Sequence, residues 1–495
     1  RSATVYDEGA YPYHGWAMLV HGWRPFADFH MKLIPLVHLL YGVPQLLLGP
    51  DMLLARYTAA LFTALTVLVA ASLARRLAGN WAAILLLALF VSNLEVAVRY
   101  YRSLCMAPTA LFFTLALYWV LTSSTRSWQY YAASLATAAL ILCRHGMLPS
   151  AMVLWGYLWL EHRKMRPGAA WGAIGTGVAV LLAVSAYYYS LAPAHFAGVM
   201  LGGLIDPEAI VGGPYGSGTE PLSISGIAWY LMMAARAYTG PILLLAPALG
   251  AFVWRVSRDR DDLRDLCYRH RALLLLIGAA AANYIAHLAA IVLFNFRIYY
   301  MQDFYIFFPI AIVAAVSFVH VARSLNAPAV RAQYGALAVA AIAAQIWANG
   351  IPAELHGDGA EMKRISVGAE AISRIIPPDE YVFSLDDPHQ FLQAGRLMHP
   401  LLTYQLFHFV DSDDTQRLLR STHYYNKEIL TRLLDDSRYA VISDGLLDWM
   451  VNSGRYDGGM QLQDAILAQL HRDFRLVETV EGAYMGPTRI YERRP

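Results

Sequence analysis

The sequence predicts a mainly α-helical, polytopic membrane protein that carries a small soluble α/β domain at its C-terminus. Hydrophobic residues make up 57% of the 495 residues, charged residues make up 15%, and the mean hydropathy is +0.40. These values lie far from ordinary globular usage. Apolar segments recur as far as residue 350, and beyond it acidic, polar and proline residues replace the alanine and leucine runs. A net charge of +2 without a basic stripe indicates that nucleic acid is not a partner.

The N-terminal segment lies ahead of the first long apolar stretch. Residues 2–32 are polar and aromatic, which is typical of a loop that follows a first transmembrane helix. We therefore expect a helix ahead of Arg1 in the complete protein. Residues 33–49 are expected to form an amphipathic juxtamembrane helix or a re-entrant segment. Together, residues 1–50 are predicted to be an outer loop that carries the catalytic residues.

A series of apolar stretches follows this loop. With the expected preceding helix, they predict about 10 to 11 transmembrane helices in a domain covering residues 1–350. The stretches lie near residues 51–75, 81–98, 105–122, 128–145, 148–160, 170–190, 236–254, 272–294, 304–322 and 334–350.

The loop charges predict the orientation of these helices. Lysine and arginine in short loops remain on the cytoplasmic side, and the basic clusters share one side when the helices alternate; they lie at 75–76, 161–166, 255–271 and 323–331. The opposite, outer side then holds residues 1–50, the turn at 99–102, the long loop 190–235 and the C-terminal domain. The glycine-rich loop 190–235 is predicted to be either a lid over a bound ligand or a slack connector. An alanine-, leucine- and arginine-rich chain suits a bacterial inner membrane, with the C-terminal domain on the periplasmic or extracellular side.

The C-terminal domain, residues 351–495, shows alternating helix and strand patterns. Helices are predicted at 361–375, 426–434 and 461–470, and strands at 381–385, 439–443, 476–480 and 489–491. This alternation predicts a small α/β layer domain. No glycine-rich phosphate loop follows any of the strands, so we expect the domain to shield or dock over the membrane part.

The residues with the clearest chemical potential stand near the N-terminus. Asp7 and Glu8 form an adjacent acidic pair, and about two dozen residues later Lys32 and Pro35 stand at the start of an apolar helix. Carboxylates so close to a bilayer are either solvated juxtamembrane charges or functional groups.

This arrangement resembles the GT-C superfamily of polyprenyl-phosphate-sugar-dependent glycosyltransferases, and most closely the protein O-mannosyltransferases and the lipid A aminoarabinose transferases. In that superfamily an acidic motif lies in the first external loop and a Lys-Pro-Pro-Leu-like element follows it; the corresponding run here is Lys32-Leu33-Ile34-Pro35-Leu36. Residues 54–79 are similar to the second helix of the superfamily and its basic end, and residues 99–118 to the second external turn and the helix after it. Arg297-Ile298-Tyr299-Tyr300 is similar to a late external loop with a phosphate-binding arginine.

The resemblance implies a membrane glycosyltransferase that moves a hexosyl or pentosyl group from a polyprenyl-phosphate donor on the outer face. The acceptor is a hydroxyl of a protein, a glycan or a lipid. Asp7 would act as general base, Glu8 would orient or bind the acceptor or a neighbouring group, and the anomeric carbon would invert. Cations would stabilise the leaving phosphate; the candidates are Lys32, Arg99, Arg102 and Arg297. The substrate-binding candidates are Tyr11, Tyr13, Asp28, His30 and Glu95.

Other interpretations of the same residues stay open. Arginines at helix ends commonly reach toward lipid phosphates, and tyrosines near them commonly belong to the interfacial aromatic belt. A divalent metal is a further option, although no tightly spaced histidine pair supports it; its ligands would come from Glu8, His14, His21, Asp28 and His30.

The main alternative function is a non-catalytic GT-C-like scaffold or assembly subunit of a membrane complex. Met31 favours it, because some relatives have an acidic residue immediately before the lysine. A transporter is disfavoured, since the ionisable residues gather at the outer edge rather than at the midplane of the membrane.

Overall fold

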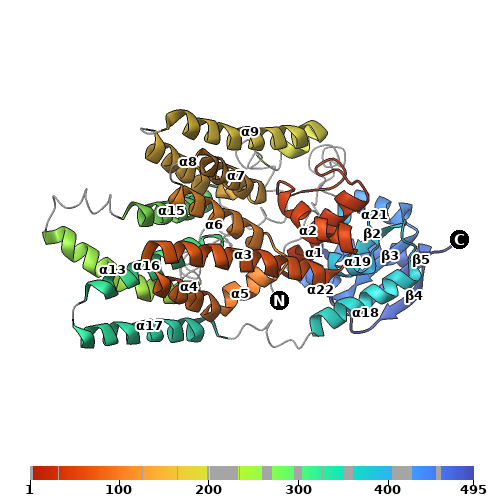
Figure 1. The fold of residues 1–495 in the computed structure, drawn as a ribbon. Coiled ribbons are helices and arrows are strands. Elements are labelled where there is room, and N and C mark those ends of the chain that lie inside the picture. The colour runs from red at the N-terminus through yellow and green to blue at the C-terminus, as the bar shows by residue number, and fades with distance from the viewer. Residues whose placement is uncertain are drawn as a thin grey trace. The chain divides into compact units, whose positions relative to one another are not determined.

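The chain is described here from a computed structural model (Figure 1). The described residues are 4–31, 33–123, 126–163, 166–197, 200, 232, 235–258, 270–294, 304–325, 327–350, 360–403, 426–452 and 459–495. The chain divides into two compact units: residues 1–58, 184–221 and 357–495 form the first, and residues 59–183 and 222–356 form the second. Each unit is described by itself.

Helices of the second unit coincide with the predicted apolar stretches. Alanine and leucine dominate them, and both residues favour helix. In chain order the helices are α3 (Met52–Ala78), which begins in the first unit, α4 (Asn80–Ser92), α5 (Leu94–Tyr101), α6 (Met106–Thr122), α7 (Ser127–Cys143), α8 (Leu148–His162), α9 (Pro167–Leu191), which ends in the first unit, α13 (Thr239–Arg258), α15 (Arg271–Phe294), α16 (Phe307–Ser324) and α17 (Pro328–Asn349).

Several of these helices can cross a bilayer. Among the described residues, four are long and apolar enough to do so alone, namely α3, α9, α16 and α17, and the bent pair α4 and α5 brings the number to five. Shorter apolar helices lie at Leu36–Leu48, Met106–Thr122 and Arg271–Ala286. The predicted polytopic helical fold is therefore confirmed, while the number of about 10 to 11 spans stays a prediction.

Helix α16 is the most enclosed of these spans. Its apolar window is 78% buried, against 11% for α17, and it packs on α4, α13 and α15 (Figure 1). A helix that is apolar all round is stable only when protein or lipid covers every side. Protein covers most of α16, and the exposed apolar face of α17 is suited to lipid.

The structure breaks the apolar stretch that the sequence predicted as a single span near 81–98. Helices α4 and α5 meet at an angle of 80°. The break occurs at Asn93, whose side chain accepts a hydrogen bond from the backbone N–H of Val96 and so caps α5. The Asn93 amide also donates to the carbonyl of Ala237 at 2.7 Å and accepts from the amide of Asn349 at 3.2 Å. These partners come from distant parts of the chain, so local hydropathy could not reveal the bend.

In the first unit, residues 1–50 contain two helices. Helix α1 (Thr4–Val20) lies where the sequence predicted a loop, and α2 (Leu36–Leu48) lies within the segment 33–49, predicted as an amphipathic helix or a re-entrant segment. The two helices cross where Gly15 and Gly42 meet: a Cβ atom on Gly15 would lie 2.0 Å from the carbonyl oxygen of His38. This close approach of the backbones explains why a proline- and glycine-containing segment is helical, because tertiary packing overrides weak local propensity.

The C-terminal part of the first unit folds as an α/β domain with a five-stranded sheet. Its elements are α18 (Ala360–Ile375), β1 (Tyr381–Leu385), α19 (Pro388–Ala394), β2 (Leu397–Met398), α21 (Lys427–Asp436), β3 (Tyr439–Ser443), α22 (Asp444–Asn452), α23 (Gly459–Asp473), β4 (Phe474–Val480) and β5 (Thr488–Arg493). The strand order is β2-β1-β3-β5-β4; β1 is parallel to β2 and β3, and β5 is antiparallel to β3 and β4. The predicted β1 and β3 match their observed bounds.

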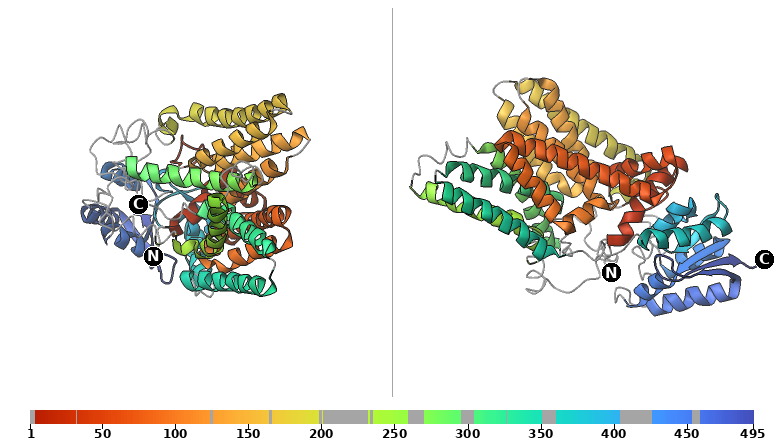
Figure 2. Two further views of the ribbon diagram at one scale, coloured as in Figure 1. Left: turned by 90° about the vertical axis from the view of Figure 1, so that its left-hand side faces the viewer. Right: turned by 60° about the horizontal axis from the view of Figure 1, so that its bottom comes forward.

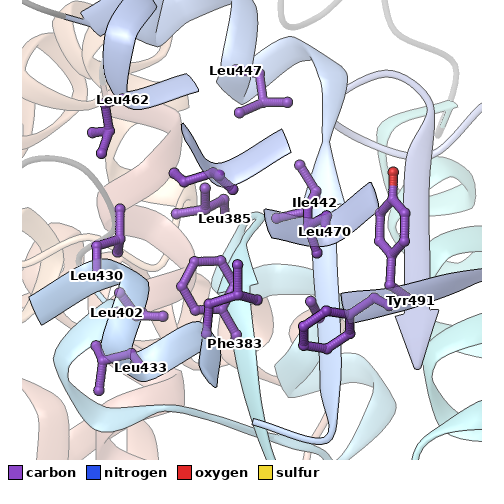
Figure 3. Packing of buried hydrophobic residues seen from close by; sticks show 14 of the residues in the cluster. Phe383, Leu385, Leu402, Leu430, Leu433, Ile442, Leu447, Leu462, Leu470 and Tyr491 are labelled. Carbon is purple, nitrogen blue, oxygen red and sulfur yellow. The ribbon is translucent and has the colours of Figure 1, made fainter. Parts of the chain in front are cut away.

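A compact core holds this domain together on one face of the sheet. Strands β1 and β3 contribute alternate side chains, as their period of two requires, and α21, α22 and α23 cover them (Figure 3). Among the core residues are Phe383, Leu385, Ile442, Leu430, Leu447, Leu470 and Tyr491. Figure 2 (right) shows α18 over the opposite face, so the domain has three layers. The sheet thereby fixes the position of the loop that follows β1.

Candidate functional site

Glu8 is the centre of a buried ionic cluster in the first unit. Its carboxylate has no exposed surface and accepts two hydrogen bonds from Arg56, from Nε to Oε1 at 2.8 Å and from Nη2 to Oε2 at 3.1 Å. This paired geometry is the strongest form of an arginine–carboxylate contact. Arg56 also pairs with Glu361 at the start of α18. One guanidinium therefore joins α1, α3 and α18.

A histidine of the C-terminal domain lies on the other side of Glu8. Nε2 of His389, in α19, lies 3.8 Å from Oε2 of Glu8. Asp387 caps α19 by accepting the backbone N–H of His389 at 3.0 Å, and the same carboxylate oxygen contacts Nδ1 of the His389 ring. All three side chains are fully buried. The ring of His389 is thus held between two carboxylates.

Helices α1 and α19 touch at Gly9. A Cβ atom at this position would lie 2.6 Å from Nδ1 of His389 and 2.8 Å from its backbone nitrogen, closer than real side chains approach. The residue next to Glu8 must therefore be glycine for His389 to reach the cluster.

The charges in this cluster support one another. Burial alone would raise the pKa of Glu8, but the interactions with His389 and Arg56 outweigh it and hold the pKa well below its usual range. Burial alone would lower the pKa of His389, but Asp387 and then Glu8 raise it to about 9. At neutral pH Glu8 is therefore ionised and His389 is protonated.

Asp386 lies beside this cluster and is also fully buried. Its carboxylate accepts hydrogen bonds from Nε2 of Gln390 at 2.8 Å and from the backbone N–H of Asp387 at 2.7 Å. Burial raises the pKa of Asp386 to about 7, against the opposing effect of these hydrogen bonds. Asp386 therefore titrates near neutrality.

Topology explains why these groups gather at one place. Asp386 and Asp387 follow β1 directly, and the chain continues from β1 to β2 on one side and later to β3 on the other. In open α/β sheets, functional side chains collect at the carboxyl ends of strands where the order reverses in this way. Here that position holds Glu8 and Gly9 of α1.

Three of the predicted site residues are not described in full. Asp7 belongs to α1, but its side chain lies outside the described residues, as do Lys32 and Arg297. The predicted loop 190–235 also lies largely outside them. The roles predicted for these residues stay predictions.

The remaining candidates of the first unit have identifiable neighbours. Tyr13 is buried and its hydroxyl accepts the backbone N–H of Met398 at 2.7 Å, which ties α1 to β2. Tyr11 packs its ring against His38 in α2, with centroids 5.0 Å apart. This hydrogen bond gives Tyr13 a structural role that is independent of the predicted role in substrate binding.

Asp28 and His30 lie in the segment between α1 and α2. Asp28 pairs with Arg24 at 2.8 Å on the surface. His30 is buried and meets the ring of His195 edge to face at 5.0 Å.

The second unit contains the other predicted cations. Glu95 lies in the first turn of α5 and Arg99 in its last turn, and Arg102 follows the helix. Both arginines are buried, unlike arginines that reach toward lipid headgroups.

The second unit also contains a group of contacting side chains formed by Arg144, Tyr305 and Cys105, and its arginine was not predicted as a site residue. Arg144, which follows α7, places its guanidinium 4.5 Å from the ring centre of Tyr305 and 3.6 Å from Sγ of Cys105. Cys105 in turn lies 2.8 Å from the Tyr305 hydroxyl. Arg144 is therefore a further candidate cation.

A metal site can be tested directly within the described part of the chain. No group of three or more histidine, cysteine, aspartate or glutamate side chains is arranged there to hold a metal ion. His14, one of the proposed ligands, stacks on Phe29 with ring centres 4.7 Å apart.

Arg56, Asp387 and His389 were also not predicted from the sequence as site residues. Two signals were present: an arginine near the start of an apolar span, which needs a partner, and the run Asp386-Asp387-Pro388-His389 directly after a predicted strand. Their pairing with Glu8 had no signal in a single sequence.

Comparison with solved structures shows the fold that this chain shares with known proteins. Two similar structures are of ArnT from Cupriavidus metallidurans, one in the apo state and one bound to undecaprenyl phosphate. Their TM-score is 0.56 in both cases, with 16% and 17% sequence identity respectively, over 98% of this chain and 93% of the other. No protein-family profile and no curated protein sequence matches the chain. The likeness shows a shared fold across almost the whole of both chains.

Proposed function

We propose that this protein is a membrane glycosyltransferase that moves a sugar from a polyprenyl-phosphate donor to an acceptor hydroxyl. The observation that carries the proposal is the buried carboxylate of Glu8, adjacent to Asp7, on the fold of a protein solved with undecaprenyl phosphate. A fold alone does not define a function. The acidic pair supplies the chemistry that this fold would need.

Asp7 is the general base in this proposal, and its carboxylate takes the proton from the acceptor hydroxyl. The acceptor oxygen attacks the anomeric carbon from the face opposite the phosphate, so a new carbon–oxygen bond forms as the bond to the phosphate oxygen breaks. The electron pair of the broken bond remains on the polyprenyl phosphate. The configuration at the anomeric carbon inverts, and general base catalysis contributes on the order of a hundredfold or more.

Cations stabilise the charge that develops on the leaving phosphate. Lys32, Arg99, Arg102 and Arg297 are the candidates from the sequence, and Arg144 is added from the structure because its guanidinium lies near Tyr305 and Cys105. A lipid-linked sugar has its anomeric carbon at the membrane surface, so these groups are proposed to face the outer side of a bacterial inner membrane. The C-terminal domain is then periplasmic.

Asp7→Asn tests the proposal. Purified protein in liposomes is given a donor panel of undecaprenyl-phosphate-linked aminoarabinose and polyprenyl-phosphate mannose, together with membranes that hold acceptors. We expect the wild type to release polyprenyl phosphate from one donor and Asp7→Asn to lose that turnover at least a hundredfold. The exposed Asp379→Asn serves as the matched control. Full turnover by Asp7→Asn would remove the assignment of the base.

A further inference from the structure

The C-terminal domain contacts α1 beside the acidic pair Asp7-Glu8, and particular charged side chains make this contact. Asp387 and His389 come from the cap and first turn of α19, the element that packs on α1. Their side chains are completely buried. A domain that only shielded a membrane part would not require buried charges at the contact, because such charges are costly to desolvate.

Each oxygen of the Glu8 carboxylate has a defined neighbour. Oε1 accepts Nε of Arg56, while Oε2 accepts Nη2 of Arg56 and faces Nε2 of His389. Asp387 fixes the His389 ring from the other side through Nδ1. This is the arrangement in which an orienting carboxylate holds a histidine and the histidine holds a second group.

The close packing of α1 against α19 also restricts how the two helices can lie. Gly9 leaves no room for a side chain against His389, so α1 can approach α19 only in this register. Asp7 and Glu8 are consecutive residues of α1. Any shift of Glu8 along or around the helix would therefore shift Asp7 with it.

We propose that Asp387 and His389 are positioning residues for the acidic motif: by holding Glu8 they set the position of Asp7, and the C-terminal domain is a working part of the site. This inference rests on the proposed function and deepens it. In this proposal Asp387 and His389 act through Glu8 and do not themselves touch the substrate. The domain supplies the support for the helix that carries the base.

Single-turnover rates test this proposal on the donor that the wild type uses. His389→Gln keeps a polar side chain but loses the charged ring between the two carboxylates. We expect its rate constant, measured on folded and monodisperse protein, to fall by on the order of tenfold to a hundredfold, since small misplacements of reacting groups cost that much. The affinity for undecaprenyl phosphate, measured separately, should remain within about twofold. His399→Gln is the matched control, because His399 belongs to the same domain and its Nδ1 accepts the backbone N–H of Leu401.

A double variant separates positioning from a general effect on stability. If His389 acts through Glu8, the pair Glu8→Gln and His389→Gln together should be no slower than the slower single variant. Asp387→Asn should behave like His389→Gln and provides a second test where one variant folds poorly. Rate constants of His389→Gln and Asp387→Asn equal to the wild type would overturn the proposal, as would additive losses in the double variant. Inactive wild type, or fully active Asp7→Asn, would instead count against the proposed function.

Discussion

Replacement of Arg56 by methionine tests the energetics of the buried cluster most sharply. The substitution keeps an apolar stem of similar length and removes the guanidinium that gives Glu8 two hydrogen bonds of 2.8 and 3.1 Å. Unit charges about 3 Å apart attract by about 6 kcal/mol at an effective dielectric constant of about 20, and desolvation offsets part of this gain. Truncating one partner of a buried pair costs about 3–5 kcal/mol. The loss from Glu361 is smaller, because its side chain is 23% exposed.

The chain provides a control with the same contact distance. Arg24 and Asp28 also pair at 2.8 Å, but their side chains are 65% and 29% exposed. We expect Arg24→Met to lower the free energy of unfolding far less than Arg56→Met, because water and salt screen an exposed pair. Equilibrium unfolding in detergent, followed by tryptophan fluorescence, gives the free energy of unfolding for both variants. Equal losses for Arg56→Met and Arg24→Met would refute the argument that burial sets the value of these pairs.

Three further predictions concern the contact between α1 and the C-terminal domain. Gly9→Ala should destabilise the protein by about 1–3 kcal/mol, because its Cβ would lie 2.6 Å from Nδ1 of His389, whereas Gly156→Ala, with no atom within 4 Å, should cost nothing in the same thermal melts. Stability should fall as the pH rises from about 6.5 toward 9, since the pKa of His389 is raised to about 9 in the folded protein, and melting curves of His389→Gln should keep only the part of the fall below about pH 8 that Asp386, with its pKa of about 7, contributes. Tyr13→Phe should lower the free energy of unfolding by about 1–3 kcal/mol, because it leaves the buried N–H of Met398 without its acceptor; an unchanged value would contradict this.

The elements of this fold were largely predictable because their signals are local. The stretches Tyr381–Leu385 and Tyr439–Ser443 are short β-branched and aromatic runs, and they form β1 and β3 as predicted. The long alanine- and leucine-rich spans were predictable for a similar reason. Helix α1 was not, because it depends on the close crossing of Gly15 and Gly42. The bend at Asn93 depends on partners more than a hundred residues away.

The candidate site was predictable only in part. The sequence identified Asp7 and Glu8 as a motif, and it left the partner of Glu8 open. The structure supplies Arg56 and His389, which come from a membrane helix and from the C-terminal domain. Such pairings arise from tertiary packing, so a single sequence contains these residues but does not reveal that they are in contact.

The products of a single reaction show whether the protein transfers sugar by a single displacement. Wild-type protein in liposomes is given the undecaprenyl-phosphate-linked sugar that it consumes, and mass spectrometry and nuclear magnetic resonance follow the lipid and the sugar. We expect one acceptor-linked sugar for each undecaprenyl phosphate released, with the anomeric configuration opposite to that of the donor. Retention of configuration would contradict the single displacement, and the absence of any transfer by the wild type would favour a non-catalytic scaffold of the same fold.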